Sequence, residues 1–243
     1  MELTTGLRRV GNEIVAAYLF IDDRGVTVVD AGLRGHYRDL LAELDAAGRS
    51  LDDVRAVILT HGDTDHIGFA ERLRRERGVP VYVHEADAAR ARGEAKPAAT
   101  SLGRGVRLGA LARFFGYALR KGGAKTEYLT QLRTVSDGDR LDLPGSPAVI
   151  GLPGHSPGSI AVHSPGLDAV CVGDALTTRH VLTGRRGPAP APFTDEPDEA
   201  LDSLARLAAT GATWVLPGHG TPWNGGAAEA VRLVREAAAA SAR

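Results

Sequence analysis

The stretch Val54-Arg55-Ala56-Val57-Ile58-Leu59-Thr60 leads directly into His61-Gly62-Asp63-Thr64-Asp65-His66. The first stretch is short, apolar and rich in β-branched residues, which is typical of a buried strand. Residues 67–73, which follow, have the composition and spacing of a helix. Four side chains able to bind a metal ion therefore lie within six residues, where a strand gives way to a helix. Imidazole nitrogens and carboxylate oxygens are the ligands that zinc and similar divalent ions use at sites kept open for chemistry.

Three further apolar stretches end in the same way, with a small or kinked residue followed at once by a potential ligand. They are Leu152-Pro153-Gly154-His155, Val172-Gly173-Asp174 and Leu216-Pro217-Gly218-His219. Side chains at strand ends on one sheet edge are held close together by a rigid framework. A single histidine is more often a structural residue than a ligand, but four such strand ends together favour one metal site.

Outside these strand ends, the sequence predicts alternating strands and helices. Two apolar stretches, residues 14–21 and 26–29, are expected to form a hairpin with Gly25 at its turn. A helix is expected over residues 36–47, before the strand that precedes the hexapeptide. Further strands are expected at residues 79–83, 141–143, 148–152, 159–163, 169–172 and 213–216, and further helices at residues 85–92, 198–210 and 227–240. This order is typical of an α/β fold.

Two segments do not follow this alternation. Residues 94–134 are expected to form a helical insertion, with an amphipathic helix over residues 108–119. All charges between Ser101 and Lys125 are positive, so this helix is either a basic lid over the active site or a packed helix with solvated arginines. Solvation is the preferred explanation for the charges, and the question of a lid stays open. Residues 184–193 are rich in Gly, Pro and Arg without periodicity, which predicts a loop.

Composition limits the kinds of partner. The 243 residues carry a formal net charge of -1, which gives no reason to expect nucleic acid or an anionic membrane. The single cysteine, Cys171, excludes an intramolecular disulfide and is expected to be a buried small side chain. The N-terminal residues lack the apolar core of a signal peptide, and no stretch is long and apolar enough to span a membrane. These features predict a single cytoplasmic domain over residues 1–243, compatible with a homodimer, that acts on a small molecule.

The four strand ends resemble the metallo-β-lactamase superfamily, whose signature is His-x-His-x-Asp-His followed by a distant His, an Asp and a last His. The matching positions are His61, Asp63, Asp65, His66, His155, Asp174 and His219. The flanking sequences Gly154-His155-Ser156-Pro157-Gly158-Ser159, Pro217-Gly218-His219-Gly220 and Val29-Asp30-Ala31-Gly32 are also similar to that family's. The resemblance covers nearly the whole chain and is weakest in the insertion. It implies a four-layer αββα sandwich, in which two mixed sheets pack together with helices outside.

Asp63 departs from this signature, which has a histidine at that position. The resemblance implies two divalent ions, the first held by His61, Asp63 and His155, the second by Asp65, His66 and His219, with Asp174 bridging them. Zinc is the expected ion, with iron or manganese as alternatives. A carboxylate in place of an imidazole adds negative charge and hardness, which favours iron or manganese and makes the bound water less acidic. Alternatively, Asp63 does not bind, and the centre has one tight and one weak site.

The activity implied by the resemblance is metal-assisted hydrolysis, in which a hydroxide held between the two ions attacks an electrophilic carbon or phosphorus. Asp65 or Asp63 is expected to accept or pass on a proton. Similarity to the glyoxalase II and lactonase side of the superfamily favours an ester, lactone or thioester over a β-lactam. The alternatives are a mononuclear iron dioxygenase of the same fold acting on a persulfide, and a non-catalytic metal-binding relative.

Two further residues are candidates for the surroundings of the metals. Asp30 is expected either to orient the ligands or to form a turn ahead of Gly32. His180 follows Asp174 by six residues and is a candidate for facing the substrate. The remaining candidates for substrate contacts are Tyr117, Tyr128, Arg185 and Arg186, and solvated surface positions are the commoner explanation for the two arginines.

Overall fold

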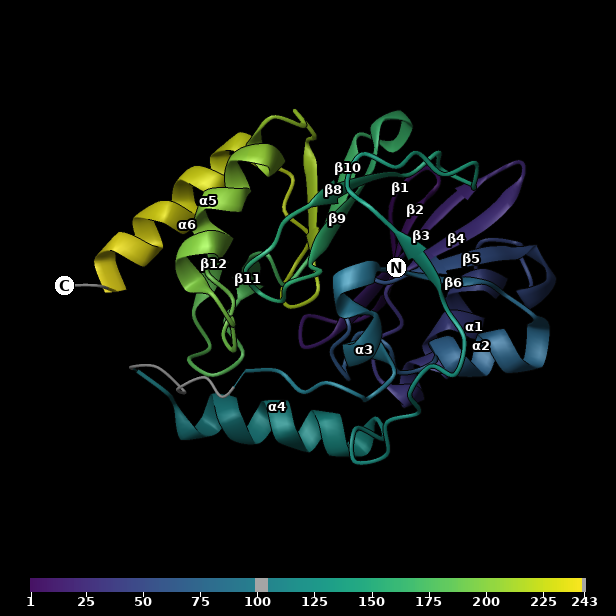
Figure 1. Ribbon diagram of the computed structural model, residues 1–243, viewed down its shortest axis with the longest axis horizontal. Helices are drawn as coiled ribbons and strands as arrows, with labels where there is room; N and C mark the ends of the chain where they lie inside the picture. Colours follow the sequence, from purple (N-terminus) through teal and green to yellow (C-terminus); the bar gives the residue numbers. More distant parts are fainter. Residues whose placement is uncertain (99–104, 242–243) are drawn as a thin grey trace.

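Two β-sheets form the centre of the molecule, in a computed structural model that describes residues 1–98 and 105–241 (Figure 1). The larger sheet contains seven strands that neighbour one another in sequence order. They are β1 (Glu2–Thr4), β2 (Leu7–Gly11), β3 (Ala16–Asp22), β4 (Gly25–Val29), β5 (Val54–Ile58), β6 (Val81–His84) and β7 (Arg133–Val135). The smaller sheet contains, in spatial order, β13 (Trp214–Pro217), β10 (Ala169–Gly173), β9 (Ile160–Ser164) and β8 (Ala148–Gly151).

The direction of pairing changes within the larger sheet. The strands from β1 to β4 pair antiparallel, whereas β4, β5, β6 and β7 pair parallel. Parallel neighbours need a crossover connection rather than a tight turn. The crossover from β4 to β5 contains α1 (Tyr37–Asp45), and the one from β5 to β6 contains α2 (Ala70–Arg77). The carboxyl ends of these parallel strands therefore share one edge of the sheet, and the ligand hexapeptide follows β5 at that edge.

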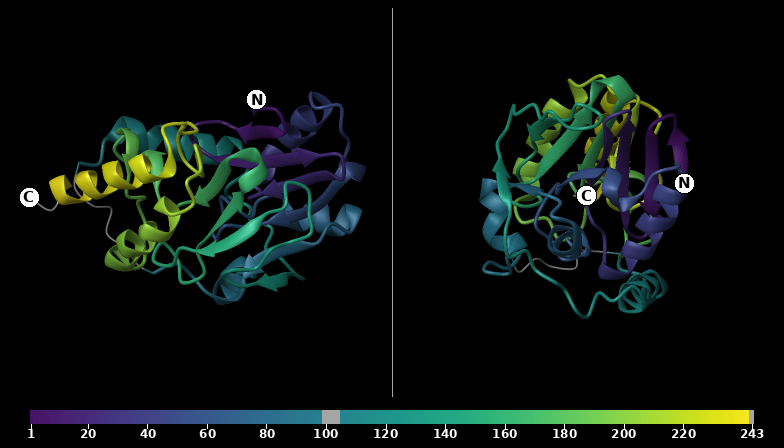
Figure 2. Two further views of the ribbon diagram at one scale, coloured as in Figure 1. Left: turned by 90° about the horizontal axis from the view of Figure 1, so that it is seen from above. Right: turned by 90° about the vertical axis from the view of Figure 1, so that its right-hand side faces the viewer.

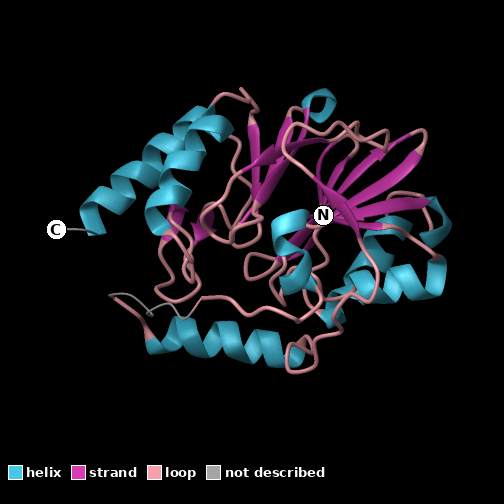
Figure 3. Ribbon diagram, viewed as in Figure 1, coloured by secondary structure: helices cyan, strands magenta, loops and turns pink. Residues whose placement is uncertain are grey.

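Apolar side chains fill three layers between helices and sheets. One layer, which includes Leu40, joins the larger sheet to α1 and α2. A second, which includes Tyr18, lies between the two sheets. A third, which includes Leu204, joins the smaller sheet to α5 (Pro197–Ala208) and α6 (Ala227–Ser241). Figures 2 and 3 show helices on the outer sides of the strands, and the predicted four-layer αββα sandwich is confirmed.

One long helix and several short ones lie outside this sandwich. α3 (Ala88–Ala91) continues a 3-10 turn over Glu85–Asp87, and further 3-10 turns cover Arg34–His36, Leu51–Asp53 and Pro165–Leu167. α4 (Leu108–Arg120) is the helix expected in the insertion and runs along one side of the molecule, apart from the sheets (Figure 1). Residues 99–104 of the insertion lie outside the described part. No helix within residues 1–98 or 105–241 is long and apolar enough to cross a membrane.

Two expectations about the elements are wrong. The expected loop over residues 184–193 contains β12 (Arg186–Ala189), which pairs antiparallel with β11 (Thr177–Arg179). Its Gly and Pro residues have low strand propensity, so the pairing depends on the partner strand rather than on local preference. Conversely, residues 141–143 form no strand, because the backbone there closes a tight turn in which Ser146 N–H donates to the carbonyl of Leu143.

Candidate metal centre

The seven candidate ligands follow strands of both sheets and converge on one centre. Their nitrogen and oxygen atoms form three overlapping groups, within each of which the ligand atoms lie no more than 4.8 Å apart. The groups are His61, Asp63 and His155; His61, His66 and Asp174; and Asp65, His66 and His219. The larger sheet supplies the four ligands after β5, and the smaller sheet supplies the three after β8, β10 and β13. The structure thus brings together every residue that the sequence predicted as a ligand.

Glycines beside the ligands allow this close approach. A Cβ atom on Gly218 would lie 2.4 Å from Cε1 of His66 and 2.7 Å from Oδ1 of Asp174. A Cβ atom on Gly173, where φ is +50°, would lie 2.2 Å from Oγ1 of Thr60. A larger residue at either position would displace the ligands or their partners, so glycine is what lets these strand ends meet.

Acceptor groups hold the outer nitrogens of two ligand histidines. Nδ1 of His66 lies 2.9 Å from Oδ2 of Asp30, and Nδ1 of His219 contacts the carbonyl oxygen of Ile14. A carboxylate and a carbonyl only accept hydrogen bonds, so Nδ1 carries the proton in both rings. When these rings are neutral, Nε2 directs its lone pair into the centre, as in a metal-binding histidine.

Hydroxyl groups set the other two histidines in the same orientation. Oγ1 of Thr60 donates to the carboxylate of Asp30 and lies 3.0 Å from Nδ1 of His61. Oγ1 of Thr194 donates to a backbone carbonyl and lies 3.3 Å from Nδ1 of His155. Because each hydroxyl proton is already used, each oxygen accepts the proton of the imidazole. All four histidines therefore present Nε2 to the centre.

These inward atoms fit a divalent cation. Nε2 of His61, His66 and His155 and Oδ1 of Asp174 are buried, and none has a hydrogen-bond partner among the described residues. Leaving buried polar atoms without partners costs about 1–3 kcal/mol each. Nitrogen and carboxylate donors together suit zinc, iron or manganese, and bound cations would give all of these atoms a partner at once.

Without a cation, acidic neighbours keep two of the histidines protonated. Burial lowers the pKa of His66, but the charges of Asp30 and Asp174 outweigh burial and raise this pKa to about 10. Burial also lowers the pKa of His219, and Asp174 again outweighs it, so that the pKa is raised to about 9. The pKa of Asp174 is held well below its usual range by these histidines, against the effect of burial. Metal binding at these rings therefore releases protons.

Asp30 combines the two roles considered for it. It accepts hydrogen bonds from the backbone N–H and the hydroxyl of Thr60, at 2.8 Å and 2.9 Å, besides its contact with His66. Its φ of +61° lies in the left-handed region, which aspartate tolerates better than most residues. Asp30 is therefore a turn residue and also orients two ligand histidines, His66 directly and His61 through Thr60.

Asp87 joins two ligand loops, and sequence analysis missed it. Its buried carboxylate accepts from the backbone N–H groups of Gly62 and Gly158, both at 2.7 Å, and from the hydroxyl of Ser156 at 2.8 Å. One side chain thus holds the hexapeptide loop against the loop of His155. No sequence signal marks Asp87, because its partners are backbone and serine groups distant along the chain.

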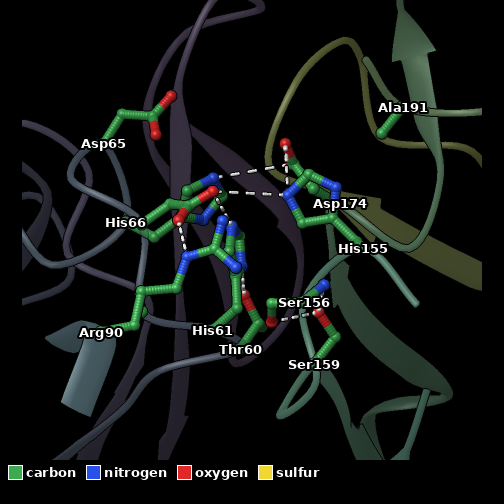
Figure 4. A network of polar contacts seen from close by, with 12 residues as sticks. Thr60, His61, Asp65, His66, Arg90, His155, Ser156, Ser159, Asp174 and Ala191 are labelled. Atoms are coloured by element: carbon green, nitrogen blue, oxygen red, sulfur yellow. Dashed lines mark hydrogen bonds and ion pairs between the residues drawn. The ribbon is translucent and has the colours of Figure 1, made fainter. Parts of the chain in front are cut away.

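Asp63 lies among the ligands and pairs with an arginine. Its Oδ2 is 3.5 Å from Nε2 of His155 and 3.7 Å from Nε2 of His61. Its Oδ1 is 2.5 Å from Nε of Arg90, which is 6% exposed and reaches into the ligand cluster from α3 (Figure 4). The two atoms do not have hydrogen-bond geometry, so their contact is an ion pair. Burial raises the pKa of Asp63, but His155, His61 and Arg90 outweigh burial and hold it well below the usual range.

A cavity of about 450 Å³ opens over the ligands. Asp63, Asp65, His155, Asp174 and His219 contribute to its lining, so the candidate centre is reachable from this cavity. Much of the remaining wall is apolar, with Leu33, Phe114, Phe115, Ala118, Leu119, Val181 and Phe193. The cavity therefore combines charged ligand groups with an apolar wall, and the ring of Phe114 lies 6.0 Å from the ring of His219.

The structure places the weaker candidates for substrate contacts in different surroundings. Tyr128 lines the cavity over the ligands. His180 lines two neighbouring cavities instead, and Arg185 lines one of them. Arg186 contacts Glu13, and Tyr117 contacts His36, so both have structural partners. Of these residues, only Tyr128 has a place where a substrate above the ligands would touch it.

α4 forms one wall of this cavity and is held by polar contacts at two points. Arg113 of α4 pairs with Glu13 at 2.7 Å, and Glu13 also pairs with Arg179 at 2.7 Å. The hydroxyl of Tyr117 lies 2.7 Å from Nε2 of buried His36. Leu33 N–H donates to Nδ1 of His36, so Nε2 carries the proton and donates to the tyrosine. These contacts fix the helix beside the metal ligands.

The fold and this ligand set define a member of the metallo-β-lactamase superfamily. The family model matches residues 10–219, and the chain belongs to this superfamily. Among solved structures, the metallo-β-lactamase family protein TTHA1429 from Thermus thermophilus has the same fold, with a TM-score of 0.71 and 24% identity over 98% of this chain and 81% of that one. TTHA1623, solved in a di-iron-bound form, gives a TM-score of 0.62 and 28% identity over 90% of this chain and 93% of that one.

Two curated relatives are similar over most of the chain. The probable metallo-hydrolase YflN of Bacillus subtilis is 28% identical over 186 residues, which are 71% of this chain and 66% of YflN. The hydroxyacylglutathione hydrolase of Ruegeria pomeroyi is 33% identical over 208 residues, which are 84% of this chain and 61% of that enzyme. The chain thus spans just under two thirds of the length of each of these relatives.

Proposed function

We propose that this protein is a metal-dependent hydrolase of small-molecule esters, lactones or thioesters. The observation that carries the proposal is the set of four histidines whose Nε2 atoms converge with carboxylates beneath an accessible cavity. Two divalent ions, zinc or alternatively iron or manganese, would be held by the residues of the three overlapping groups, with Asp174 shared. The di-iron form of TTHA1623 and the name of YflN support metal binding and hydrolysis.

Metal binding and proton transfer are assigned to different residues of the centre. Divalent ions bound in such a site acidify a water molecule and polarise the acceptor oxygen of the substrate. Asp65 lines the cavity and is partly exposed, so its carboxylate is placed to accept a proton and pass it to solvent. Asp63 is a poorer base, because its pKa is held low and Arg90 occupies one of its oxygens. We therefore assign proton transfer to Asp65 and metal binding to Asp63.

The apolar wall of the cavity supports a substrate with an apolar group beside its reacting carbonyl. Phe115 and Leu119 of α4 are 51% and 66% exposed and line the cavity, so they offer apolar surface to a bound molecule. Burying one methylene group contributes about 0.8 kcal/mol. The name of the Ruegeria pomeroyi relative supports a thioester among the classes considered.

A substrate panel tests this proposal. Aryl esters of increasing acyl length, an acyl thioester and a lactone are compared with the protein freed of metal and then loaded with zinc, manganese or iron. We expect no turnover without metal, turnover with it, and a rise in kcat/KM of about fourfold per added methylene. Leu119→Ala is expected to lower kcat/KM for long acyl chains more than for acetate.

The matched control is Leu41→Ala, which removes an exposed leucine from α1 outside the cavity lining. It should leave the dependence on acyl length unchanged. No cleavage of any class by fully metal-loaded protein would contradict the proposal. Oxygen uptake with a persulfide by such a protein would favour the iron dioxygenase instead.

A further inference from the structure

We propose that Asp63 and Arg90 act together as the equivalent of one neutral histidine ligand, with Arg90 as a positioning residue that offsets the charge of Asp63. This inference rests on the metal centre proposed above. The family signature has an uncharged imidazole where this chain has a carboxylate. Asp63 adds one negative charge at that position, and the guanidinium beside it adds one positive charge.

The two oxygens of Asp63 face different partners. Oδ1 lies against Nε of Arg90, whereas Oδ2 is directed toward Nε2 of His61 and His155. Asp63 contributes one carboxylate oxygen to the group that could hold the first ion, and Oδ2 is the oxygen that lies 3.5 Å from Nε2 of His155. The arginine therefore leaves Asp63 one free oxygen, so that it offers a single donor atom, as an imidazole would.

Arg90 is itself held from the opposite side. Its Nη1 lies 2.9 Å from Oδ2 of Asp195, which is 12% exposed. The backbone N–H of Asp195 donates to the carbonyl of His155 at 3.1 Å, and its Oδ1 accepts from Ala98 N–H at 3.1 Å. A buried guanidinium is tolerated only when it is paired, and Asp195 supplies a pair that does not depend on Asp63. Arg90 is thus fixed beside the ligand cluster.

This arrangement changes one expectation from the sequence. An unbalanced carboxylate would weaken the pull of the first ion on its bound water, whereas a balanced one would not. With Arg90 beside Asp63, a first ion would be closer to the electron-withdrawing strength expected with a neutral ligand than with an unpaired carboxylate, while Asp195, which shares the guanidinium, leaves the three side chains with one negative charge in total. The hardness of the carboxylate oxygen is unaffected, so the preference for iron or manganese stays a prediction.

A cycle of variants tests whether the two residues compensate each other. Wild type, Asp63→His, Arg90→Gln and the double variant are freed of metal, and their zinc and manganese affinities are measured by competition with a chromophoric chelator. Asp63→His is expected to weaken the first site by about tenfold, because Arg90 then faces the cation with no carboxylate between them. The double variant Asp63→His/Arg90→Gln should return to within about threefold of wild type. Arg90→Gln alone should still bind two ions.

Two further variants separate charge from size and folding. Asp63→His/Arg90→Lys keeps the positive charge and is expected to stay as weak as Asp63→His. Asp63→Asn, with and without Arg90→Gln, repeats the cycle with a side chain of the same size if Asp63→His does not fold. The control is Arg74→Gln, which removes an ion pair with buried Glu71; neither residue belongs to the ligand groups, so metal affinity should be unchanged.

The outcomes distinguish the two proposals. Fewer than one bound ion per wild-type chain would overturn the proposed metal centre and this inference with it. Two bound ions in the wild type, with effects of Asp63 and Arg90 substitutions that simply add, would overturn only the role of Arg90. Circular dichroism and the thermal midpoint of each metal-free variant show that affinity is compared among folded proteins.

Discussion

At the residue scale, the orientation of each ligand histidine is decided by a partner outside the ligand signature. Asp30, Ile14, Thr60 and Thr194 supply an acceptor for Nδ1 in the four rings. Only the carboxylate of Asp30 among them carries a charge. The other three partners are a backbone carbonyl and two hydroxyls, which act by geometry rather than by charge.

Thr60→Val tests the role of these Nδ1 partners. The substitution leaves Nδ1 of His61 without an acceptor and removes one donor from Asp30. We expect metal affinity to fall by about 10–100-fold while the fold is kept, because outer partners fix the ring that binds the ion. Measurement of zinc affinity by chelator competition checks the prediction.

Thr27→Val is the matched control for Thr60→Val. Thr27 is a fully buried threonine of β4, and its hydroxyl has no hydrogen-bond partner among the described residues. The same chemical change there should leave metal affinity unchanged and should not lower stability. Equal losses of affinity in the two variants would show that the effect does not come from the contact of Thr60 with His61.

The sequence predicted the ligands and Asp30, but not the other residues that hold the ligands in place. His61, His155 and His219 stand out because each follows a strand and is set beside glycine. Asp87 and Arg90 lie in a helical segment whose sequence contains no recognisable motif, and they contact residues distant in sequence. Such partners depend on which loops the fold brings together, and no local sequence pattern indicates that.

At the element scale, α4 connects the cavity over the candidate ligands to the body of the protein. Its apolar residues line the cavity, while Tyr117 and Arg113 attach it to His36 and Glu13. The amphipathic pattern predicted this helix, whereas its position depends on partners distant in sequence, both these polar contacts and the apolar packing of Tyr117 against Ile14 and Leu33. Short strands such as β1, β7 and β12 escaped prediction for a related reason, since pairing partners rather than their own residues stabilise them.

Buried His36, the partner of Tyr117 in α4, should make the folded protein less stable in acid. Burial, together with the charge of Lys121, lowers the pKa of His36 to about 4 from its ordinary value of 6.5. Above pH 6.5 the histidine is neutral in both states, so protonation has no effect on stability. As the pH falls from 6.5 to 4, the unfolded chain binds a proton that the folded chain does not, and up to about 3 kcal/mol of stability is lost.

Denaturant unfolding of wild type and His36→Gln over this pH range measures the effect. Glutamine keeps a donor and an acceptor but does not titrate. The variant should therefore gain stability relative to wild type as the pH falls. Parallel stability curves for the two proteins from neutral pH to pH 4 would contradict the prediction.

Glu13→Gln tests the second attachment of α4. Glu13 contacts Arg113, Arg179 and Arg186, so its neutralisation leaves three arginines close together without their common anion. We expect faster amide hydrogen exchange in α4, a higher KM for long-chain esters, and a loss of unfolding free energy of about 1 kcal/mol.

Glu229→Gln provides the control for Glu13→Gln. It removes an ion pair with Arg232 on the exposed side of α6, away from the cavity. Hydrogen exchange in α4 and KM should remain at wild-type values. An unchanged exchange rate in α4 of Glu13→Gln would show that the three arginine contacts do not hold the helix.

On the scale of the whole molecule, the candidate metal ligands come from both sheets. Four ligands follow a strand of the larger sheet and three follow strands of the smaller one. The sequence predicted this sandwich through its resemblance to a known family, since the alternation of elements alone does not say which sheets pack together. Bound ions would therefore stabilise the packing between the sheets as well as enable chemistry.

Metal removal is expected to lower the thermal midpoint. An ion present at about 1,000 times its dissociation constant stabilises the folded state by about 4 kcal/mol. For a chain of this size, that corresponds to a shift on the order of 10 °C. Differential scanning calorimetry with a chelator, and after addition of zinc or manganese, measures it. Identical midpoints with and without metal would contradict a cation bound to the folded state.

The pairing of Asp63 with Arg90 also has an evolutionary consequence. Under the proposed compensation, a histidine-type centre and an aspartate-type centre differ by two substitutions in separate elements, and each substitution alone would unbalance the charge at the first ion. An ancestor could cross between the two types only through a less fit intermediate, or after Asp195 had made a buried arginine tolerable. Relatives should therefore fall into two lineages, with few sequences that carry one member of the pair without the other.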